Sequence, residues 1–218
     1  MKLDADLQRD VLDELKWEPS VNEEDIGVTV RGGVVTLTGN VPTYTEKFAA
    51  ERATKRVDGV RAVAEELKVK LSSSDERDDT DIAQAAAYAL DWNVFVPHNK
   101  VKATVENAWI TLSGDIEWNY QREAAHDVVR HLLGVKGVTN RMKVESPSLL
   151  TVEVRSKIEA AFKRNMMKDA DGISVEAHDG RVKLHGKVQS WEEHDDAGIA
   201  AWSAPGVTEV ENEIEVTY

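Results

Sequence analysis

The chain contains no cysteine among its 218 residues, so it can form no disulfide, no thiolate metal site and no cysteine nucleophile. It also lacks any apolar run near the roughly 18 residues that a membrane-spanning helix needs, which predicts no transmembrane segment. The first residues, Met1 to Asp6, lack the apolar core of a secretory signal. A cytoplasmic protein is therefore expected, and a periplasmic one would require that a leader had been removed.

Positive charge is also scarce, because 27 Lys and Arg residues stand against 40 Asp and Glu residues and give a formal net charge of −13. Nucleic acids and anionic membranes are polyanions, so this balance disfavours nucleic acid as a partner, while a local basic patch can still hold an anionic one. The hydrophobic content of 41% is that of a folded globular protein.

The usual catalytic motifs are absent, since the sequence holds no P-loop, dinucleotide fingerprint or nucleophile elbow. His126 and His131 are five residues apart and lie on different faces of their helix. The acidic run around His194 lacks the glycine turn and spaced ligands of a calcium loop. The sequence therefore predicts a protein that is not an enzyme and has no cofactor and no metal site.

What the chain does contain is a threefold internal repeat. A short motif ends in an anchor glycine at Gly39, Gly114 and Gly186, at offsets of 75 and 72 residues and without gaps. Twenty residues after each anchor comes a Gly-Val pair, which adds three further glycines at Gly59, Gly134 and Gly206. We expect all six glycines to be structural turns at which a side chain is excluded.

Each repeat reads as helix, strand, strand, helix, strand. Leu7, Val11, Leu12 and Leu15 recur at helical spacing, and Asp4 or Asp6 is placed to cap that first helix. Alternating strands follow, and an alanine-lined second helix is expected at about 43–57, 118–133 and 190–204. The predicted fold class is α+β, with three tandem two-layer αββαβ units at 3–71, 78–146 and 149–218. Each unit is expected to have a three-stranded mixed sheet covered on one face by two helices.

The repeat resembles the BON domain, named for bacterial osmotically inducible and nodulation proteins. The motif Val-x-Leu-x-Gly-x-Val around the anchor, and Gly-Val-x-x-Val-x-Asn-x-Ile-x-Val from Gly206 to Val216, carry the resemblance, and unit 1 departs from it at Glu65. The resemblance implies a non-catalytic binding or scaffold protein linked to osmotic stress, with phospholipid headgroups or an envelope or protein partner as ligand. The alternative that it implies is a soluble stress protein that binds an ion or a small ligand.

One surface is the candidate binding site. Strand alternation places five residues, hereafter the basic face, on the outward side of the second sheet: Lys100, Lys102, Trp109, Arg141 and Lys143. This face can hold an anionic headgroup or nucleic acid, dock on an acidic face of another unit, or remain a solvated sheet surface. The corresponding face of the third unit is acidic, with Glu176, Glu211, Glu213 and Glu215. The acidic net charge favours docking over lipid.

The six tryptophans invite a second interpretation. Trp17 and Trp92 align at the end of the first helix, and Trp191 aligns with Tyr44 at the start of the second helix, one position from Trp118. Because the positions repeat, packing is favoured over ligand stacking for this set.

Overall fold

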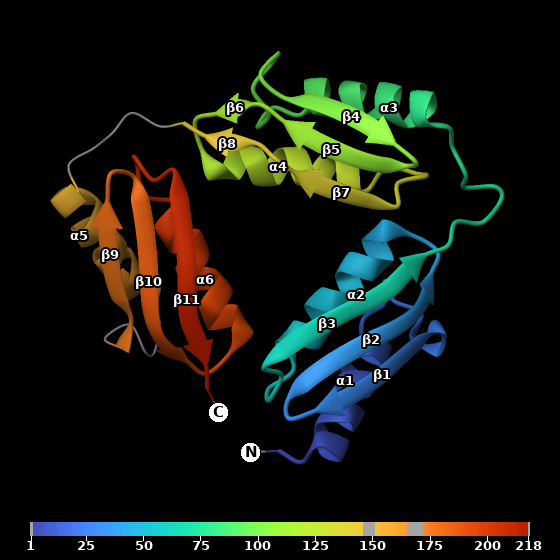
Figure 1. The fold of residues 1–218 in the computed structure, drawn as a ribbon, viewed down its shortest axis with the longest axis horizontal. Coiled ribbons are helices and arrows are strands. Elements are labelled where there is room, and N and C mark those ends of the chain that lie inside the picture. The colour runs from blue at the N-terminus through green and yellow to red at the C-terminus, as the bar shows by residue number, and fades with distance from the viewer. Residues whose placement is uncertain (1, 146–150, 165–171, 218) are drawn as a thin grey trace.

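The computed structural model describes residues 2–145, 151–164 and 172–217, which form three αββαβ units (Figure 1). Unit 1 contains α1 (Asp4–Trp17), the 3-10 helix η1 (Glu23–Asp25), β1 (Ile26–Arg31), β2 (Val34–Val41), α2 (Tyr44–Arg56) and β3 (Ala62–Val69). Unit 2 contains α3 (Asp79–Trp92), β4 (Lys102–Glu106), β5 (Trp109–Ser113), β6 (Asp115–Ile116), α4 (Asn119–Arg130), β7 (Gly137–Asn140) and β8 (Lys143–Val144). Unit 3 contains α5 (Thr151–Arg164), β9 (Ser174–His178), β10 (Arg181–Val188), α6 (Trp191–Trp202) and β11 (Glu209–Val216). The predicted unit ends at 146, 149 and 218 lie outside the described residues.

The sheets have the predicted mixed topology. In each unit the second strand lies in the middle, antiparallel to the first strand and parallel to the third. The parallel register is the same three times, because Val34 lies opposite Ala62, Trp109 opposite Gly137 and Arg181 opposite Glu209. The α+β fold class is therefore confirmed.

The second sheet departs from a uniform three-stranded one. Its second and third strands are interrupted at Gly114 and around Arg141, which separates the short β6–β8 pair from β4, β5 and β7. Pairing resumes in the same register, with Asp115 opposite Lys143. The interruption is therefore a local break in one continuous pair.

The third strand is fastened to the second helix by one side chain in each unit. Asn140 donates to the Arg122 carbonyl at 3.3 Å, and Asn212 donates to the His194 carbonyl at 2.8 Å. In unit 1, Glu65 replaces this asparagine and pairs with Lys47, Oε2 to Nζ at 2.8 Å. An ion pair across the same two elements thus substitutes for the amide.

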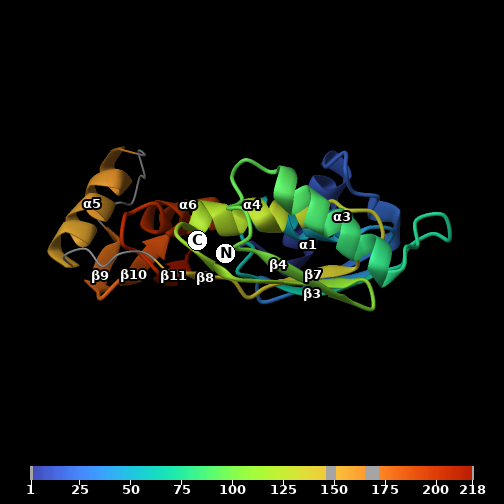
Figure 2. The same ribbon diagram turned by 90° about the horizontal axis from the view of Figure 1, so that it is seen from above.

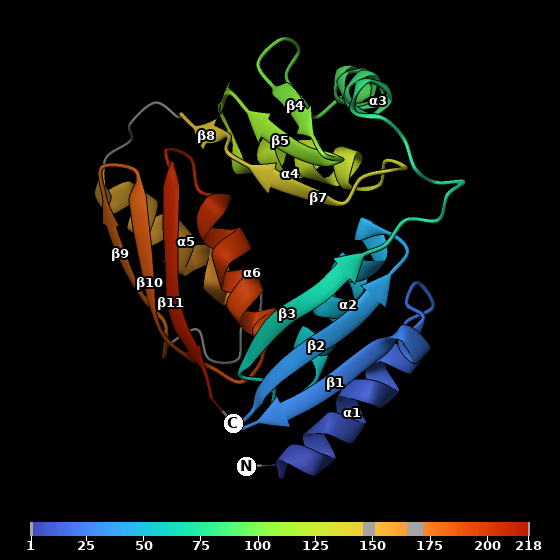
Figure 3. The same ribbon diagram turned by 45° about the vertical axis from the view of Figure 1, so that its right-hand side comes forward.

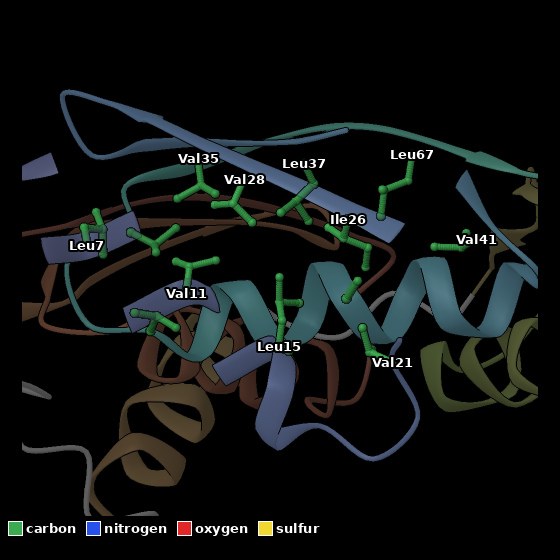
Figure 4. Packing of buried hydrophobic residues seen from close by; sticks show 14 residues of the cluster. Leu7, Val11, Leu15, Val21, Ile26, Val28, Val35, Leu37, Val41 and Leu67 are labelled. Carbon is green, nitrogen blue, oxygen red and sulfur yellow. The ribbon is translucent and has the colours of Figure 1, made fainter. Parts of the chain in front are cut away.

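Each unit has its own apolar core between its helices and its sheet. Figure 4 shows Leu7, Val11 and Leu15 of α1 in the cluster with Val35 and Leu37 of the sheet. The predicted helical stripe is correct for these three residues, whereas Leu12 is exposed. Three separate cores mean that each unit is stabilised largely by its own burial of apolar surface.

The first helix is tied to the hairpin by an aspartate. Asp4 does not cap α1, whose N-cap is Leu3, and the capping prediction is wrong for this residue. Its carboxylate instead accepts hydrogen bonds from the backbone N–H groups of Gly32 and Gly33, at 2.8 and 3.2 Å. Asp79 does the same in unit 2 for Asn107 and Ala108. The aspartate therefore joins helix and turn.

The three units close into a flat ring. Figure 1 shows them around a triangle, with the two chain ends side by side, and Figure 3 agrees. Seen from the edge in Figure 2, the helices lie on one side of the ring, the helix side, and the strands on the other, the sheet side. The exposed faces of all three sheets therefore point in the same direction.

The second helices join the ring head to tail. The start of α2 meets the end of α4, where Arg130 lies 4.1 Å from the ring centroid of Phe48. The start of α4 meets the end of α6, where Arg122 lies 4.6 Å from the ring centroid of Trp202. The start of α6 meets the end of α2 through Trp191. Each junction thus places a cation against an aromatic ring.

Candidate functional site

The sheet side of the ring carries the basic face. Lys102 begins β4, Trp109 begins β5, and Lys143 begins β8, while Lys100 and Arg141 lie beside these strands. All five side chains are exposed. The hydrogen bonds and ring contacts given for the unit junctions each involve a second helix and none involves the basic face. The docking of this face on another unit therefore gains no support from these contacts.

The five residues are not equally available to a ligand. Lys100 donates to Glu117 Oε1 at 2.8 Å, and this bond lowers the pKa of the Glu117 carboxyl. Lys102, Arg141 and Lys143 have no ion pair within the part of the chain that the structure describes. These three residues are therefore the cations of the basic face that are open to an anion.

Trp109 lies flat across the sheet. Its indole N–H donates to the Thr139 hydroxyl at 2.8 Å, and its ring lies where a side chain at Gly137 would stand. The side chain remains 45% exposed. Trp109 therefore offers one rigid aromatic surface beside the open cations.

The sheet face of unit 3, the expected acidic docking partner, pairs four of its glutamates with basic side chains of its own. Cations on β10 stand opposite glutamates on β11 in register, in four rows. Five ion pairs between 2.6 and 3.7 Å join them: Arg181 with Glu209, Lys183 with Glu211 and Glu213, His185 with Glu213, and Lys187 with Glu215. The bonds to Glu213 and Glu211 raise the pKa of Lys183. The bond to Lys183 lowers the pKa of Glu213. With Glu176 of β9 included, five carboxylates face three Lys and Arg side chains, so this face keeps part of its acidic charge.

Unit 1 adds positive charge to the sheet side. Lys68 on β3 and Lys70 after it are exposed, and neither has an ion pair among the described residues. Glu66, in the same strand, partly offsets them. Open cations thus belong to units 1 and 2 on this side of the ring, and unit 3 has its own paired with glutamates.

The six glycines predicted as turns all have a positive φ, from 86° at Gly206 to 147° at Gly186. At Gly39, Gly114 and Gly186 an added Cβ would overlap the backbone carbonyl oxygen of Asp25, Lys100 or Gly172. These three anchors therefore have two reasons to lack a side chain. They position the sheet and take no part in the chemistry of the basic face.

The prediction that the repeated aromatic residues pack is correct at some positions and wrong at others. Trp17 and Trp92 are 81% and 74% exposed, so packing is the wrong interpretation at the end of the first helix. Trp191 does pack, because its indole N–H donates to the Val60 carbonyl of unit 1 at 2.7 Å. Tyr44 packs against the core of unit 2. These contacts join units, which the alignment of positions within a unit did not reveal.

The acidic run around His194 gives no sign of a cation site. His194 Nδ1 lies 2.9 Å from Asp195 Oδ1, and the His194 ring packs edge-on against Trp191. Within the described ranges, no three His, Asp or Glu side chains are grouped so that they could hold a metal ion. Within the same ranges, no helix is both long and apolar enough to cross a bilayer.

The repeated unit matches a known protein family. The sequence model of the BON domain matches residues 3–70, 78–146 and 151–218. Osmotically-inducible protein Y of Escherichia coli (strain K12) is 27% identical over 130 residues, which cover 58% of this chain and 65% of that protein. The match therefore spans just under two thirds of the relative's length.

Two solved structures show a weaker similarity. CdsD, a structural protein of the type III secretion system of Chlamydia trachomatis, is 15% identical, with 97% of this chain and 92% of that chain covered and a TM-score of 0.28. The PrgH periplasmic domain is 11% identical, with 95% and 100% covered and a TM-score of 0.22. Scores this low support no inference about function.

Proposed function

Because the chain belongs to the BON domain family, we propose that it is a non-catalytic binding protein of the osmotic stress response. Its ligand, in this proposal, is an anionic phospholipid surface. The name of its relative, an osmotically inducible protein, supports the stress association. We also propose a cytoplasmic location, from which the protein would reach the inner face of an anionic membrane.

One observation carries the proposal: all three sheets face the same side of a flat ring, and open cations gather on that side in units 1 and 2 (Figure 2). A flat side can meet a flat bilayer with several cations at once. Each lysine or arginine near an anionic surface contributes about 1 kcal/mol, and an exposed tryptophan such as Trp109 suits the headgroup region.

The net charge of −13 opposes this contact at long range. Binding must therefore come from the local cations and must weaken with salt, because the Debye length falls to about 8 Å at physiological ionic strength. An acidic protein partner would use the same cations. The ion-binding alternative has no supporting group of ligands among the described residues.

Vesicle flotation tests the proposal. We expect the wild-type protein to float with phosphatidylglycerol vesicles at low salt and not with phosphatidylcholine vesicles. The triple variant Lys102→Ser, Arg141→Ser, Lys143→Ser should bind roughly 100-fold more weakly, since it loses about 3 kcal/mol.

A matched triple variant on the helix side controls for the change in net charge. Arg9, Lys16 and Arg164 are exposed residues of α1 and α5, and their replacement by Ser should leave flotation at least as strong. An equal loss of vesicle binding in both variants would mean that binding depends on total charge, and it would refute a site on the sheet side. No flotation of the wild-type protein at low salt would refute lipid binding itself.

A further inference from the structure

The three junctions of the ring are built from equivalent positions, and this allows them to be compared directly. Counted from the anchor glycine, Tyr44, Asn119 and Trp191 occupy the same position at the start of the second helix. Lys55, Arg130 and Trp202 occupy the same position near its end. A residue that is exceptional at one junction can therefore be recognised against the other two.

At two of the junctions an aromatic side chain at the start of one second helix crosses to the next unit. Tyr44 packs against the core of unit 2, and Thr45 beside it donates to the Arg130 carbonyl at 3.2 Å. Trp191 crosses to unit 1 and donates its indole N–H to the Val60 carbonyl at 2.7 Å. In both cases a ring from the start of one helix occupies the space beside the next unit.

The junction of units 3 and 1 also has complementary charges. A depression beside Trp191 is lined by cations from α2 and carboxylates from α6: Arg52, Lys55, Arg56, Glu192, Asp195 and Asp196. Lys55 and Arg56 form their ion pairs within unit 1, with Glu51 and with Glu14 and Glu18. The lining of this junction is therefore charged and polar.

The junction of units 2 and 3 is different at the same positions. Where α2 has its cations, α6 has Ile199, Trp202 and Ser203. Where Tyr44 and Trp191 cross to the next unit, α4 has Asn119. An asparagine is too short to cross as Tyr44 and Trp191 do. The result is a depression of about 860 Å³, hereafter the junction site, which falls in the range of small-ligand pockets.

The walls of the junction site are aromatic and exposed. Phe95 and Tyr120 are in edge-on ring contact at 6.2 Å between centroids and are 59% and 54% exposed. Ile199 on the opposite wall is 63% exposed. Trp118 and Trp202 also line the site. Large apolar side chains gathered in a concave site between two units mark a place for an apolar group.

A polar atom in the wall of the site, covered by its neighbours, lacks a partner. Asn119 Oδ1 is buried and accepts no hydrogen bond, and it is the only such side-chain atom in the part of the chain that the structure describes. A buried acceptor without a donor is costly. An occupant that brings an N–H donor removes this cost, as the indole N–H of Trp191 does for Val60 at the equivalent junction.

The charges at the rim favour a cation. Glu123 and Asp127 line the site, and their side chains are 56% and 53% exposed. Arg122 lies 3.6 Å from Glu123, and Arg130 lies 3.3 Å from Asp127, so each carboxylate is partly paired. Neither arginine belongs to the lining, although Arg122 stacks over the Trp202 ring. The other aromatic walls, Phe95, Trp118 and Tyr120, remain to attract a cation.

We propose that the junction site binds an aromatic amine, that is, a flat apolar ring attached to a protonated group with N–H donors. The ring takes the place that Tyr44 and Trp191 fill at the other junctions, and an N–H donates to Asn119 Oδ1 once rotation of the Asn119 side chain exposes that atom. This site lies on the helix side and is independent of the proposed lipid surface. The source of the group is a free aryl-alkyl amine or a lysine beside an aromatic residue in a partner peptide.

Calorimetric titration with 2-phenylethylammonium tests the proposal. We expect this probe to bind the full-length protein, and phenylacetate, with the same ring and the opposite charge, to bind at least about tenfold more weakly. The capped peptide Phe-Lys-Phe separates the sources: tighter binding than the free amine assigns the site to a peptide, and weaker binding assigns it to a small molecule. Binding of neither cation refutes the site.

Two substitutions at Asn119 locate the binding. Asn119→Trp restores the ring found at the equivalent position in unit 3 and should abolish binding while leaving the protein folded. Asn119→Leu keeps the size, removes the acceptor and should weaken binding about tenfold. Trp17→Ala, which removes an exposed aromatic residue elsewhere, is the control and should bind like the wild-type protein. Unchanged affinity in both Asn119 variants would overturn the proposal.

Discussion

At the scale of single residues, the positions that repeat between units are set more by the backbone conformation they must adopt than by side-chain chemistry. Ala108 illustrates this, since it is a buried alanine with a φ of 63° at the hairpin turn, where unit 1 has Gly33. Asp79 accepts hydrogen bonds from the N–H groups of Asn107 and Ala108 and so supports an unfavourable conformation. The turn is maintained although its glycine is absent.

The anchor glycines provide the test at this scale. Gly114→Ala places a methyl group against the Lys100 carbonyl oxygen at a φ of 142°, and we expect a loss of about 1–3 kcal/mol in the free energy of unfolding. Gly172→Ala is the control, because its Cβ would meet only the Lys187 carbonyl oxygen, at 4.0 Å. Urea unfolding of both variants measures the difference. Equal stability of the two would mean that the anchor tolerates a side chain.

The repeat makes some residues predictable and leaves others hidden. The six turn glycines follow from their spacing, because only a backbone requirement places glycine so regularly. The role of Asp4 could not be predicted, since it depends on where the hairpin lies relative to α1. The packing prediction is wrong for Trp17 and Trp92, because a repeated aromatic position indicates packing only when a neighbouring element covers it. None of the described residues buries these two side chains.

At the scale of elements, the amphipathic pattern predicted the second helices to within a few residues, as α2, α4 and α6 show. The contacts made by the side chains near the ends of these helices could not be predicted from the sequence. Sequence shows that Phe48, Arg122 and Trp191 lie near helix starts, but the partner of each belongs to another unit. The pairing depends on how the ring closes, which no pattern within one unit encodes.

The junction of units 1 and 2 should respond to acid through His126 of α4. Its ring centroid lies 6.3 Å from that of Phe48, and burial lowers the pKa of the imidazole below 6.5, with Arg130 acting the same way and Glu123 and Asp127 opposing. A pKa that is lower in the folded state means that the folded protein takes up this proton less readily. The stability from His126 is therefore full above about pH 6.5 and is lost as the pH falls.

We expect the free energy of unfolding to fall more steeply between about pH 6.5 and 5 in the wild-type protein than in His126→Gln. Urea unfolding at a series of pH values measures this slope. His178→Gln is the control, since that side chain is 86% exposed and the variant should keep the wild-type slope. Parallel profiles for the wild-type protein and His126→Gln would contradict the expected coupling.

At the scale of the whole molecule, closing the ring serves the proposed function by holding three sheets in one direction (Figure 2). Separate units on flexible linkers would present their cations independently, whereas a closed ring presents them together. The two chain ends lie side by side (Figures 1 and 3), and Lys2 and Thr217 line one depression. Ring closure therefore depends on the junction of units 3 and 1, which no linker spans.

Trp191→Ala tests this dependence, because the change removes the hydrogen bond to Val60 and the ring between α6 and α2. We expect the junction to weaken by about 1–3 kcal/mol and the ring to open, with a larger radius of gyration in small-angle X-ray scattering. The unit cores are separate, so far-ultraviolet circular dichroism should not change. Trp17→Ala, which alters an 81% exposed side chain, should leave the radius unchanged. If Trp191→Ala kept the wild-type radius, closure would rest on other contacts, and its vesicle binding should then also match that of the wild-type protein.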